Sequence, residues 1–133
     1  MLVPCKRTTS VLATRDPDVE ATVVESLAAL GSAAPRLTTV DNMGDCVVAV
    51  RLLDPCCVLL DDGIEDAPGQ TLVEAVHQAR ASCPVVYIAS RHSLDLEREV
   101  RRQGVLFYIA RPEGKELQSH LGSILKGLLR RTG

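Results

Sequence analysis

The chain has 133 residues, which is most simply a single domain, and 46% of them are hydrophobic, which is enough for a packed core. Aromatic residues make up only 2%, so we expect an aliphatic core. A formal net charge of −2 argues against a general nucleic-acid binder, and no apolar run approaches the roughly 18 residues of a membrane span. We therefore expect a cytoplasmic protein.

The first predicted strand, at 9–14, is followed by a helix. Asp16 and Pro17 begin this helix, because aspartate is a good N-cap and proline is favoured at the first helical position. Apolar residues recur at helical spacing until Gly31, which is placed to end the helix. Residues 1–8 precede the strand, and we expect them to be flexible.

The middle of the chain repeats this alternation of strand and helix. A weaker strand is expected at 36–40, a helix at 45–53 and a third strand at 57–61. A loop at 63–69, which contains acidic residues, proline and glycine, leads into a helix at 71–81.

The last part of the chain begins with a strand at 84–89, whose proline lies at the first position, where a missing N–H is tolerated. Ser93 caps a charged helix that runs to 103, and a fifth strand is expected at 105–110. Leucine and isoleucine residues at helical spacing predict a final helix that begins at 113 or 114.

Strands and helices alternate throughout with short connections, and this pattern implies a parallel sheet covered by helices on both faces. The predicted fold class is therefore α/β, a doubly wound domain. We expect one domain over 1–133, with its core at about 9–129.

The third strand ends in Asp61, Asp62 and Gly63. An uninterrupted apolar run is typical of a strand buried on both faces, and ligands of open α/β sheets bind just beyond the carboxyl ends of the strands. Asp61 and Asp62 therefore fall where such a fold carries its chemistry. Because successive strand residues face opposite ways, we do not expect both to point inward.

The five cysteines are odd in number and lack the spacing of a metal site, and the three histidines lie far apart. We expect the cysteines to be small buried hydrophobes in a reducing compartment. A metal or redox role is the alternative.

Two stretches, VLLDDGIEDAPGQTL and PVVYIASRHSLDLEREVRRQGVLFYIARPEGKEL, resemble the receiver domains of two-component response regulators. The resemblance extends over about 9–129 and depends on spacing more than on identity. It implies a three-layer, flavodoxin-like domain with five parallel strands in the order 2-1-3-4-5.

The resemblance assigns roles to several positions. Asp61 falls on the phospho-acceptor aspartate of the family, and Gly69 falls on its loop glycine. The family has threonine or serine at the end of strand four, where this chain has Ala89, with Ser90 one place late. Tyr108 matches the aromatic residue of the family's switch.

Other family positions are changed. Arg111 replaces the essential lysine, while the following Pro112 is retained. The acidic pair that holds the divalent metal falls on Thr14 and Arg15, and Asp16 matches the next residue. Only the acceptor aspartate survives among the hallmark positions, so the resemblance is to a degenerate member, a pseudo-receiver.

The matching pocket offers one carboxylate and two guanidinium groups, whereas a hard divalent cation requires oxygen ligands and negative charge. We expect Arg15 to pair with Asp61 in the metal's place and magnesium to bind poorly. The alternative leaves Arg15 in solvent and Asp61 as an exposed strand-end acid. Inward rotation of Asp62 or Asp16 is a further alternative that restores negative charge.

The fourth helix carries Arg98, Arg101 and Arg102 beside two glutamates. Such a face is a solvated mixed-charge surface or an interface with a partner or a second copy. The resemblance implies pairing through helix four, strand five and helix five. The apolar stripe of the last helix is wider than one sheet contact needs, which favours burial against a partner or continuation as a linker helix. The ending LLRRTG is typical of a domain boundary, so an attached effector domain is a further expectation. We expect no direct nucleic-acid binding by this domain.

The leading hypothesis is a non-enzymatic signalling module of a response regulator, whose state is set by partner binding or dimerisation and which needs no cofactor. The alternative is a receiver that accepts a phosphoryl group on Asp61, with magnesium, and regulates an effector such as a transcription regulator in a phosphorelay. A third hypothesis is an anion binder that uses Arg15 and Arg111. No glycine-rich phosphate loop or nucleophile–base pair supports an enzyme.

Overall fold

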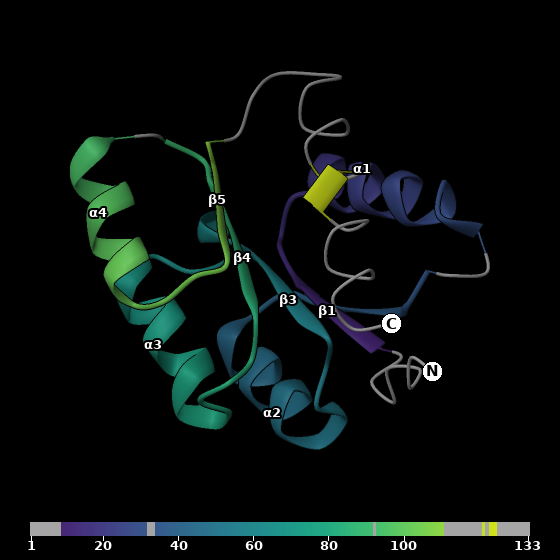
Figure 1. Ribbon diagram of the computed structural model, residues 1–133, viewed down its shortest axis with the longest axis horizontal. Coiled ribbons are helices and arrows are strands. Elements are labelled where there is room, and N and C mark those ends of the chain that lie inside the picture. The colour runs from purple at the N-terminus through teal and green to yellow at the C-terminus, as the bar shows by residue number, and fades with distance from the viewer. Residues whose placement is uncertain (1–8, 32–33, 92, 111–120, 122, 125–133) are drawn as a thin grey trace, which may run out of the picture.

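The computed structural model describes residues 9–31, 34–91, 93–110, 121, 123 and 124 (Figure 1). Its centre is a parallel sheet in the order β2-β1-β3-β4-β5, which confirms the predicted class and strand order. The strands are β1 (Thr9–Ala13), β2 (Arg36–Val40), β3 (Cys57–Asp61), β4 (Val85–Ala89) and β5 (Phe107–Ala110).

Four α-helices with defined ends lie within residues 9–110 as the structure describes them, and they cover the two faces of the sheet. They are α1 (Pro17–Ala28), α2 (Met43–Leu53), α3 (Gly69–Ala79) and α4 (Leu94–Arg102), and a short 3₁₀ helix (Asp62–Ile64) follows β3. In Figure 1, α2, α3 and α4 lie on one side of the sheet and α1 lies on the other. The domain therefore has the three layers of a doubly wound fold.

Alternation along the strands divides the core in two. The core under α2, α3 and α4 takes from the sheet Val11, Ala13, Val58, Leu60, Val85, Tyr87 and Ala89. The core under α1 takes from the sheet Leu12, Cys57, Leu59, Val86, Ile88 and Ile109. Every residue of β3 and β4 is buried, as the uninterrupted apolar runs predict.

Local hydrogen bonds fix where the helices begin. The Asp16 carboxylate accepts from the Asp18 N–H at 2.8 Å, so the predicted cap of α1 is confirmed. The predicted cap at Ser93 is confirmed in the same way. The helix expected at 45–53 begins earlier, because the Asn42 side chain accepts from the Asp45 N–H at 2.8 Å.

Other boundaries differ by up to three residues from the prediction. The helix expected from 71 begins at Gly69, and the strand expected from 105 begins at Phe107. Helix α1 ends at Ala28, three residues before Gly31, which does adopt the left-handed φ of 63°. Differences of this size are the ordinary uncertainty of an element's ends.

The predicted final helix is described only at Leu121, Ser123 and Ile124, which are helical. Leu121 is fully buried in the core under α1, and Ile124 packs against the same core. The rest of that helix, the flexible segment expected at 1–8 and the turn at Arg111 and Pro112 lie outside the described residues. Among the described residues, no helix is long and apolar enough to cross a membrane.

The cysteines behave as the sequence predicts. Cys46, Cys56, Cys57 and Cys83 are buried free thiols, and Cys5 lies outside the described residues. Burial raises the pKa of Cys46 to about 11. A hydrogen bond with Cys56 and then burial raise the pKa of Cys57. Cys46 and Cys57 are therefore poor nucleophiles at neutral pH.

We expect these four thiols to resist a thiol-specific disulfide reagent in the native protein. The raised pKa alone slows Cys46 about 100-fold, because two pKa units lower the thiolate fraction by that factor. The measurement is thiol release at pH 8 with and without denaturant, and unfolding should make all five cysteines react. Rapid reaction of more than one cysteine in the native state would contradict the prediction.

Candidate functional site

The acid that ends β3 is buried at the carboxyl edge of the sheet. Asp61 is only 2% exposed. Its Oδ2 accepts a hydrogen bond from the Thr14 hydroxyl at 2.6 Å, and its Oδ1 accepts one from the Gly63 N–H at 3.1 Å. Thr14 directly follows β1, the neighbouring strand, and its own N–H donates to Val40. Parallel pairing of β1 and β3 therefore brings the hydroxyl to the carboxylate.

The predicted pairing of Arg15 with Asp61 is wrong. Arg15 is exposed, and the ion pairs among the described residues include none between these two side chains. The neutral Thr14 hydroxyl takes the place next to Asp61 that we had assigned to the guanidinium. A hydroxyl can be buried with one hydrogen bond, whereas a buried guanidinium needs several. The alternative of an exposed Asp61 is also wrong.

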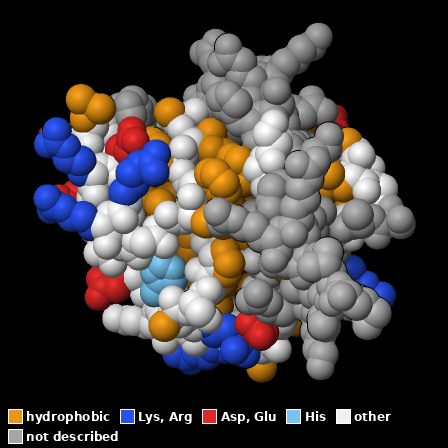
Figure 2. All heavy atoms as spheres, viewed as in Figure 1, with side chains coloured by type: hydrophobic (Ala, Val, Ile, Leu, Met, Phe, Trp, Pro, Cys, Tyr) orange, Lys and Arg blue, Asp and Glu red, His pale blue; other side chains and the backbone are white. Residues whose placement is uncertain are grey.

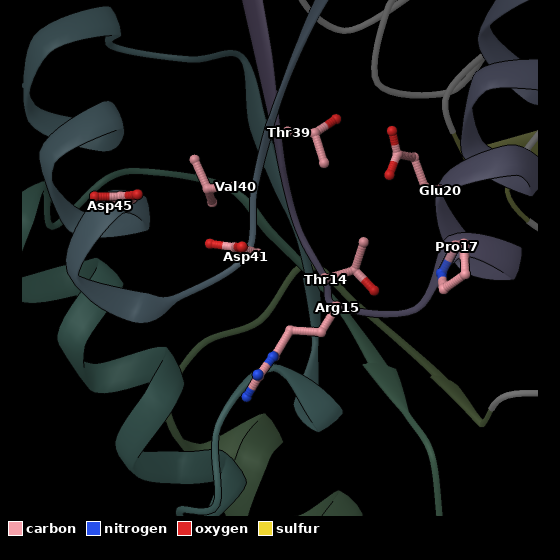
Figure 3. Close-up of a pocket in the computed structure, with 8 residues that line it drawn as sticks. All are labelled: Thr14, Arg15, Pro17, Glu20, Thr39, Val40, Asp41 and Asp45. Carbon is pink, nitrogen blue, oxygen red and sulfur yellow. The ribbon is translucent and has the colours of Figure 1, made fainter.

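Arg15 lies between two open pockets at this edge of the sheet. One, of about 340 Å³, is lined by Arg15, Asp16, Pro17, Asp61, Gly63 and Ser90. The other, of about 480 Å³, is lined by Thr14, Arg15, Pro17, Glu20, Thr39, Val40, Asp41 and Asp45. Figure 3 shows the Arg15 side chain extending away from Glu20 of α1. Arg15 therefore borders the Asp61 pocket without forming an ion pair with Asp61.

Asp62 is held on the other side of the sheet. Its Oδ1 accepts from the Ser90 N–H at 2.9 Å, and its Oδ2 accepts from the Tyr87 hydroxyl at 3.2 Å. The expectation that Asp61 and Asp62 face opposite ways is confirmed, and the alternative in which Asp62 turns toward Asp61 is wrong. Ser90 contributes to this site through its backbone and is exposed.

Tyr87 is the residue that sequence analysis missed. It is fully buried in an otherwise aliphatic core, and its hydroxyl reaches Asp62. A Cβ atom at Gly69 would collide with the Tyr87 hydroxyl and lie 2.9 Å from Tyr87 Cζ. The bare Cα of Gly69 is therefore what leaves room for the phenol. The available signal was a polar aromatic residue within a run that is otherwise aliphatic.

Tyr108 on β5 lies beside Tyr87 on β4 and is partly exposed. The two rings stack with centroids 5.7 Å apart and an interplanar angle of 9°. The Arg101 guanidinium lies 5.9 Å from the Tyr108 centroid and pairs with Glu97 at 2.8 Å. Tyr108 is partly buried. Ala89 is fully buried. Arg111 and Pro112 lie outside the described residues.

Both tyrosines are held in the protonated form. Burial, followed by the Asp62 carboxylate, raises the pKa of Tyr87. Burial, followed by the Glu97 carboxylate, raises the pKa of Tyr108, and Arg101 lowers it. Both hydroxyls therefore keep their protons at neutral pH, which lets Tyr87 donate to Asp62.

We expect the protein to lose stability above about pH 10, the pKa of tyrosine in an unfolded chain. There the unfolded state releases a proton that folded Tyr87 keeps, so the free energy of unfolding falls by up to about 1.4 kcal/mol per pH unit for this residue. The measurement is urea unfolding at pH 8 to 11.5 for the wild type and Tyr87→Phe. The stability difference between them should be constant below pH 9 and fall above pH 10. Parallel curves would exclude a raised pKa for Tyr87.

The described residues at this edge of the sheet form no ready-made cluster of metal ligands. Both oxygens of Asp61 and both oxygens of Asp62 already accept hydrogen bonds. Among the residues that the structure describes, no three His, Cys, Asp or Glu side chains are placed to share a metal ion. A hard divalent ion needs several oxygen ligands with net negative charge. Here the acids Asp61 and Asp16 share the pocket with the exposed Arg15, and the neutral Thr14 hydroxyl bonds to Asp61.

Comparison with known proteins gives matches by structure alone. No family model matches the chain, and no curated protein matches it in sequence. Three similar solved structures share 16–19% identity with it. A CheY-like response regulator receiver domain protein from Methanospirillum hungatei has 16% identity, a TM-score of 0.73 and coverage of 95% of this chain and 99% of that chain. A two-component response regulator from Clostridium difficile has 19% identity, a TM-score of 0.77 and coverage of 94% and 98%. The Mn²⁺-bound form of response regulator Rcp1 has 16% identity, a TM-score of 0.80 and coverage of 95% and 97%.

These structures establish that the chain has the CheY-like fold of response regulator receiver domains over nearly its whole length. In this fold Asp61 is the last residue of β3, as the resemblance implies.

Proposed function

We propose that this chain is a receiver-like signalling domain that acts by protein contact and not by magnesium-dependent phosphorylation, a pseudo-receiver. The single observation that carries the proposal is the 2.6 Å hydrogen bond between the Thr14 hydroxyl and Asp61 Oδ2. A neutral side chain therefore holds the acceptor carboxylate at the position where the resemblance implies a metal-binding acid. The role is one of signalling without catalysis.

Charge supports this proposal. Phosphoryl transfer to a carboxylate depends on positioning and on neutralising the repulsion between two anions. Among the described residues that line the pocket, Arg15 is the one cationic side chain. It is exposed and forms no ion pair with Asp61. A bound Mn²⁺ ion is named for Rcp1, whereas the oxygens of Asp61 in this chain are used by Thr14 and Gly63.

The contact surface that we propose is the face formed by α4 and β5. Figure 2 shows arginine side chains gathered over the α4 part of the visible face. Arg98, Arg101 and Arg102 are exposed there, and Leu94 at the start of α4 is 68% exposed. A protein partner, a second copy or an attached effector domain fits this mixture of charge and apolar surface. A cytoplasmic location follows from the proposed role.

One observation favours the phosphorylatable alternative. Asp61 is retained and borders an open pocket of about 340 Å³ with Gly63 and Ser90. A small phosphodonor has room to approach the carboxylate there. The two hypotheses differ in whether Asp61 accepts a phosphoryl group.

The test is incubation of the intact chain with a small acyl-phosphate donor and Mg²⁺, followed by intact-mass measurement. We expect no species heavier by one phosphoryl group, under conditions in which an active receiver domain is modified. A heavier species that disappears in Asp61→Asn, but persists in Asp62→Asn, would overturn the pseudo-receiver proposal and support the alternative. The two variants are matched because both remove one carboxylate charge from neighbouring positions.

A further inference from the structure

We infer that Tyr87 is a positioning residue that locks the α4–β5 surface in one arrangement and ties it to the Asp62 carboxylate. The lock consists of Asp62, Tyr87, Tyr108 and Arg101. This inference deepens the proposed function, on which it rests for the meaning of that surface as a partner face. These four side chains contact one another in sequence, from the edge of the sheet to the solvent-exposed surface.

The inner end of the lock is a hydrogen-bonded carboxylate. Asp62 opens the 3₁₀ helix after β3, and its Oδ2 accepts from the Tyr87 hydroxyl at 3.2 Å. Its Oδ1 accepts from the Ser90 N–H, at the point where β4 has ended. One side chain therefore joins the ends of β3 and β4. Removing the carboxylate leaves a buried hydroxyl without its acceptor, which is costly in a core.

The middle of the lock has no spare room. The Tyr87 ring is 0% exposed, and the space beside its hydroxyl is closed by the backbone of Gly69 at the start of α3. Leu96 of α4 lies on the same side, 3.0 Å from where a Cβ of Gly69 would stand. Tyr87 therefore has one position that is compatible with α3 and α4 as they pack, and close packing makes such positions discrete.

The outer end of the lock is half-exposed. Tyr108 stacks on Tyr87 with centroids 5.7 Å apart, and Arg101 of α4 lies over Tyr108 at 5.9 Å. Tyr87 and Tyr108 are register partners on β4 and β5, so the stacked Tyr87 ring fills the space on one face of the Tyr108 ring. Tyr108 cannot move toward β4 while Tyr87 is in place. Ala89, the neighbouring strand-end residue, has no hydroxyl to attract it.

The consequence is a coupling between two sites on the molecule. A change in the hydrogen bonds of Asp62 shifts Tyr87, and a shifted Tyr87 changes the ring contacts of Tyr108 and, through them, of Arg101. A partner that displaces Tyr108 must, for the same reason, disturb Asp62. Linkage of this kind is reciprocal. It does not depend on any chemistry at Asp61.

The test replaces Asp62 and measures the spectroscopic signals of Tyr108 and Arg101. The chain has two tyrosines and no tryptophan, so its near-ultraviolet tyrosine signal comes from this pair alone. In Asp62→Ala we expect loss of most of the near-ultraviolet circular dichroism of the tyrosines, together with shifts of the Tyr108 ring and Arg101 Nε resonances in NMR spectra of the whole chain. Tyr87→Phe, which keeps the ring and removes the hydroxyl, should shift the same Arg101 resonance less.

The matched control is Asp66→Ala, which removes an exposed acid from the same loop. It should leave the Tyr108 and Arg101 resonances unchanged. Folded Asp62→Ala with wild-type Tyr108 and Arg101 signals would overturn the inference. If Asp62→Ala fails to fold, Tyr87→Phe decides, since it removes the same hydrogen bond; an unchanged Arg101 Nε resonance in that variant would overturn the inference. Phosphorylation of Asp61 does not enter the measurement, so failure here and failure of the pseudo-receiver proposal are distinguishable.

Discussion

Replacing Thr14 and Arg15 together by aspartate is expected to give the chain a divalent-cation site, which we propose that the wild type lacks. The hydroxyl of Thr14 is 2.6 Å from Asp61 Oδ2, so a carboxylate at position 14 would stand directly beside the acceptor acid. A second acid at position 15 borders the same pocket. Clustered carboxylate oxygens are the ligands that Mg²⁺ prefers, and the ion would relieve their mutual repulsion.

The expected size of this effect is large. Without metal, the added carboxylate should destabilise the variant, because two like charges would meet in a site where Asp61 is 2% exposed. With Mg²⁺ at ten times the dissociation constant, binding restores about 1.4 kcal/mol to the free energy of unfolding. The measurement is the thermal midpoint in MgCl₂ against KCl of equal ionic strength. We expect a rise in midpoint for the double variant and none for the wild type.

A matched control separates a specific site from a general gain of negative charge. Thr71→Asp with Arg98→Asp makes the same change of residue types at exposed positions on α3 and α4. It should show no response to magnesium beyond that of the wild type. If the double variant at 14 and 15 also shows no response to magnesium, the lack of acids at these two positions is not what prevents metal binding. The pseudo-receiver proposal would then lose its main physical reason.

The fold was predictable because its signals are local and repeated. The apolar runs that became β3 and β4 are buried along their whole length, and Asp16 and Ser93 cap the helices that they were expected to cap. Short connections between alternating elements leave a parallel sheet as the simple solution. Element ends were less certain, since the Asn42 cap was not foreseen and α2 begins two residues earlier.

The site was predictable only in part, for a physical reason. Spacing along the chain placed Asp61 and Asp62 at the sheet edge but could not predict the hydrogen-bond partner of either carboxylate. Thr14 and Arg15 are adjacent in sequence, but their side chains point in different directions. The Thr14 hydroxyl is therefore buried against Asp61, whereas the Arg15 side chain is exposed. The Tyr87 contact with Asp62 joins residues 25 apart, and it also depends on the missing side chain of Gly69.

Replacing Gly69 by alanine is expected to destabilise the protein by about 1–3 kcal/mol, the usual cost of overpacking a close-packed core. The added Cβ would collide with the Tyr87 hydroxyl, and would also lie 2.9 Å from Tyr87 Cζ and 3.0 Å from Leu96 Cδ1. Helix propensity acts in the opposite sense, because alanine is a better helix former than glycine at the start of α3. The measurement is the urea midpoint with the slope of the transition held constant.

A control and a rescue make this prediction specific to the lock. Gly63→Ala should change stability by no more than about 0.5 kcal/mol, because its Cβ would meet nothing nearer than Asp61 Oδ1 at 3.6 Å. Gly69→Ala should be less harmful in a Tyr87→Phe background, where the colliding oxygen is gone. A double-mutant cycle measures this as a favourable coupling energy, since two residues in contact do not act additively. Additive effects would mean that Gly69 and the Tyr87 hydroxyl do not compete for the same space, and the Tyr87 ring would then have freedom to move without disturbing Asp62.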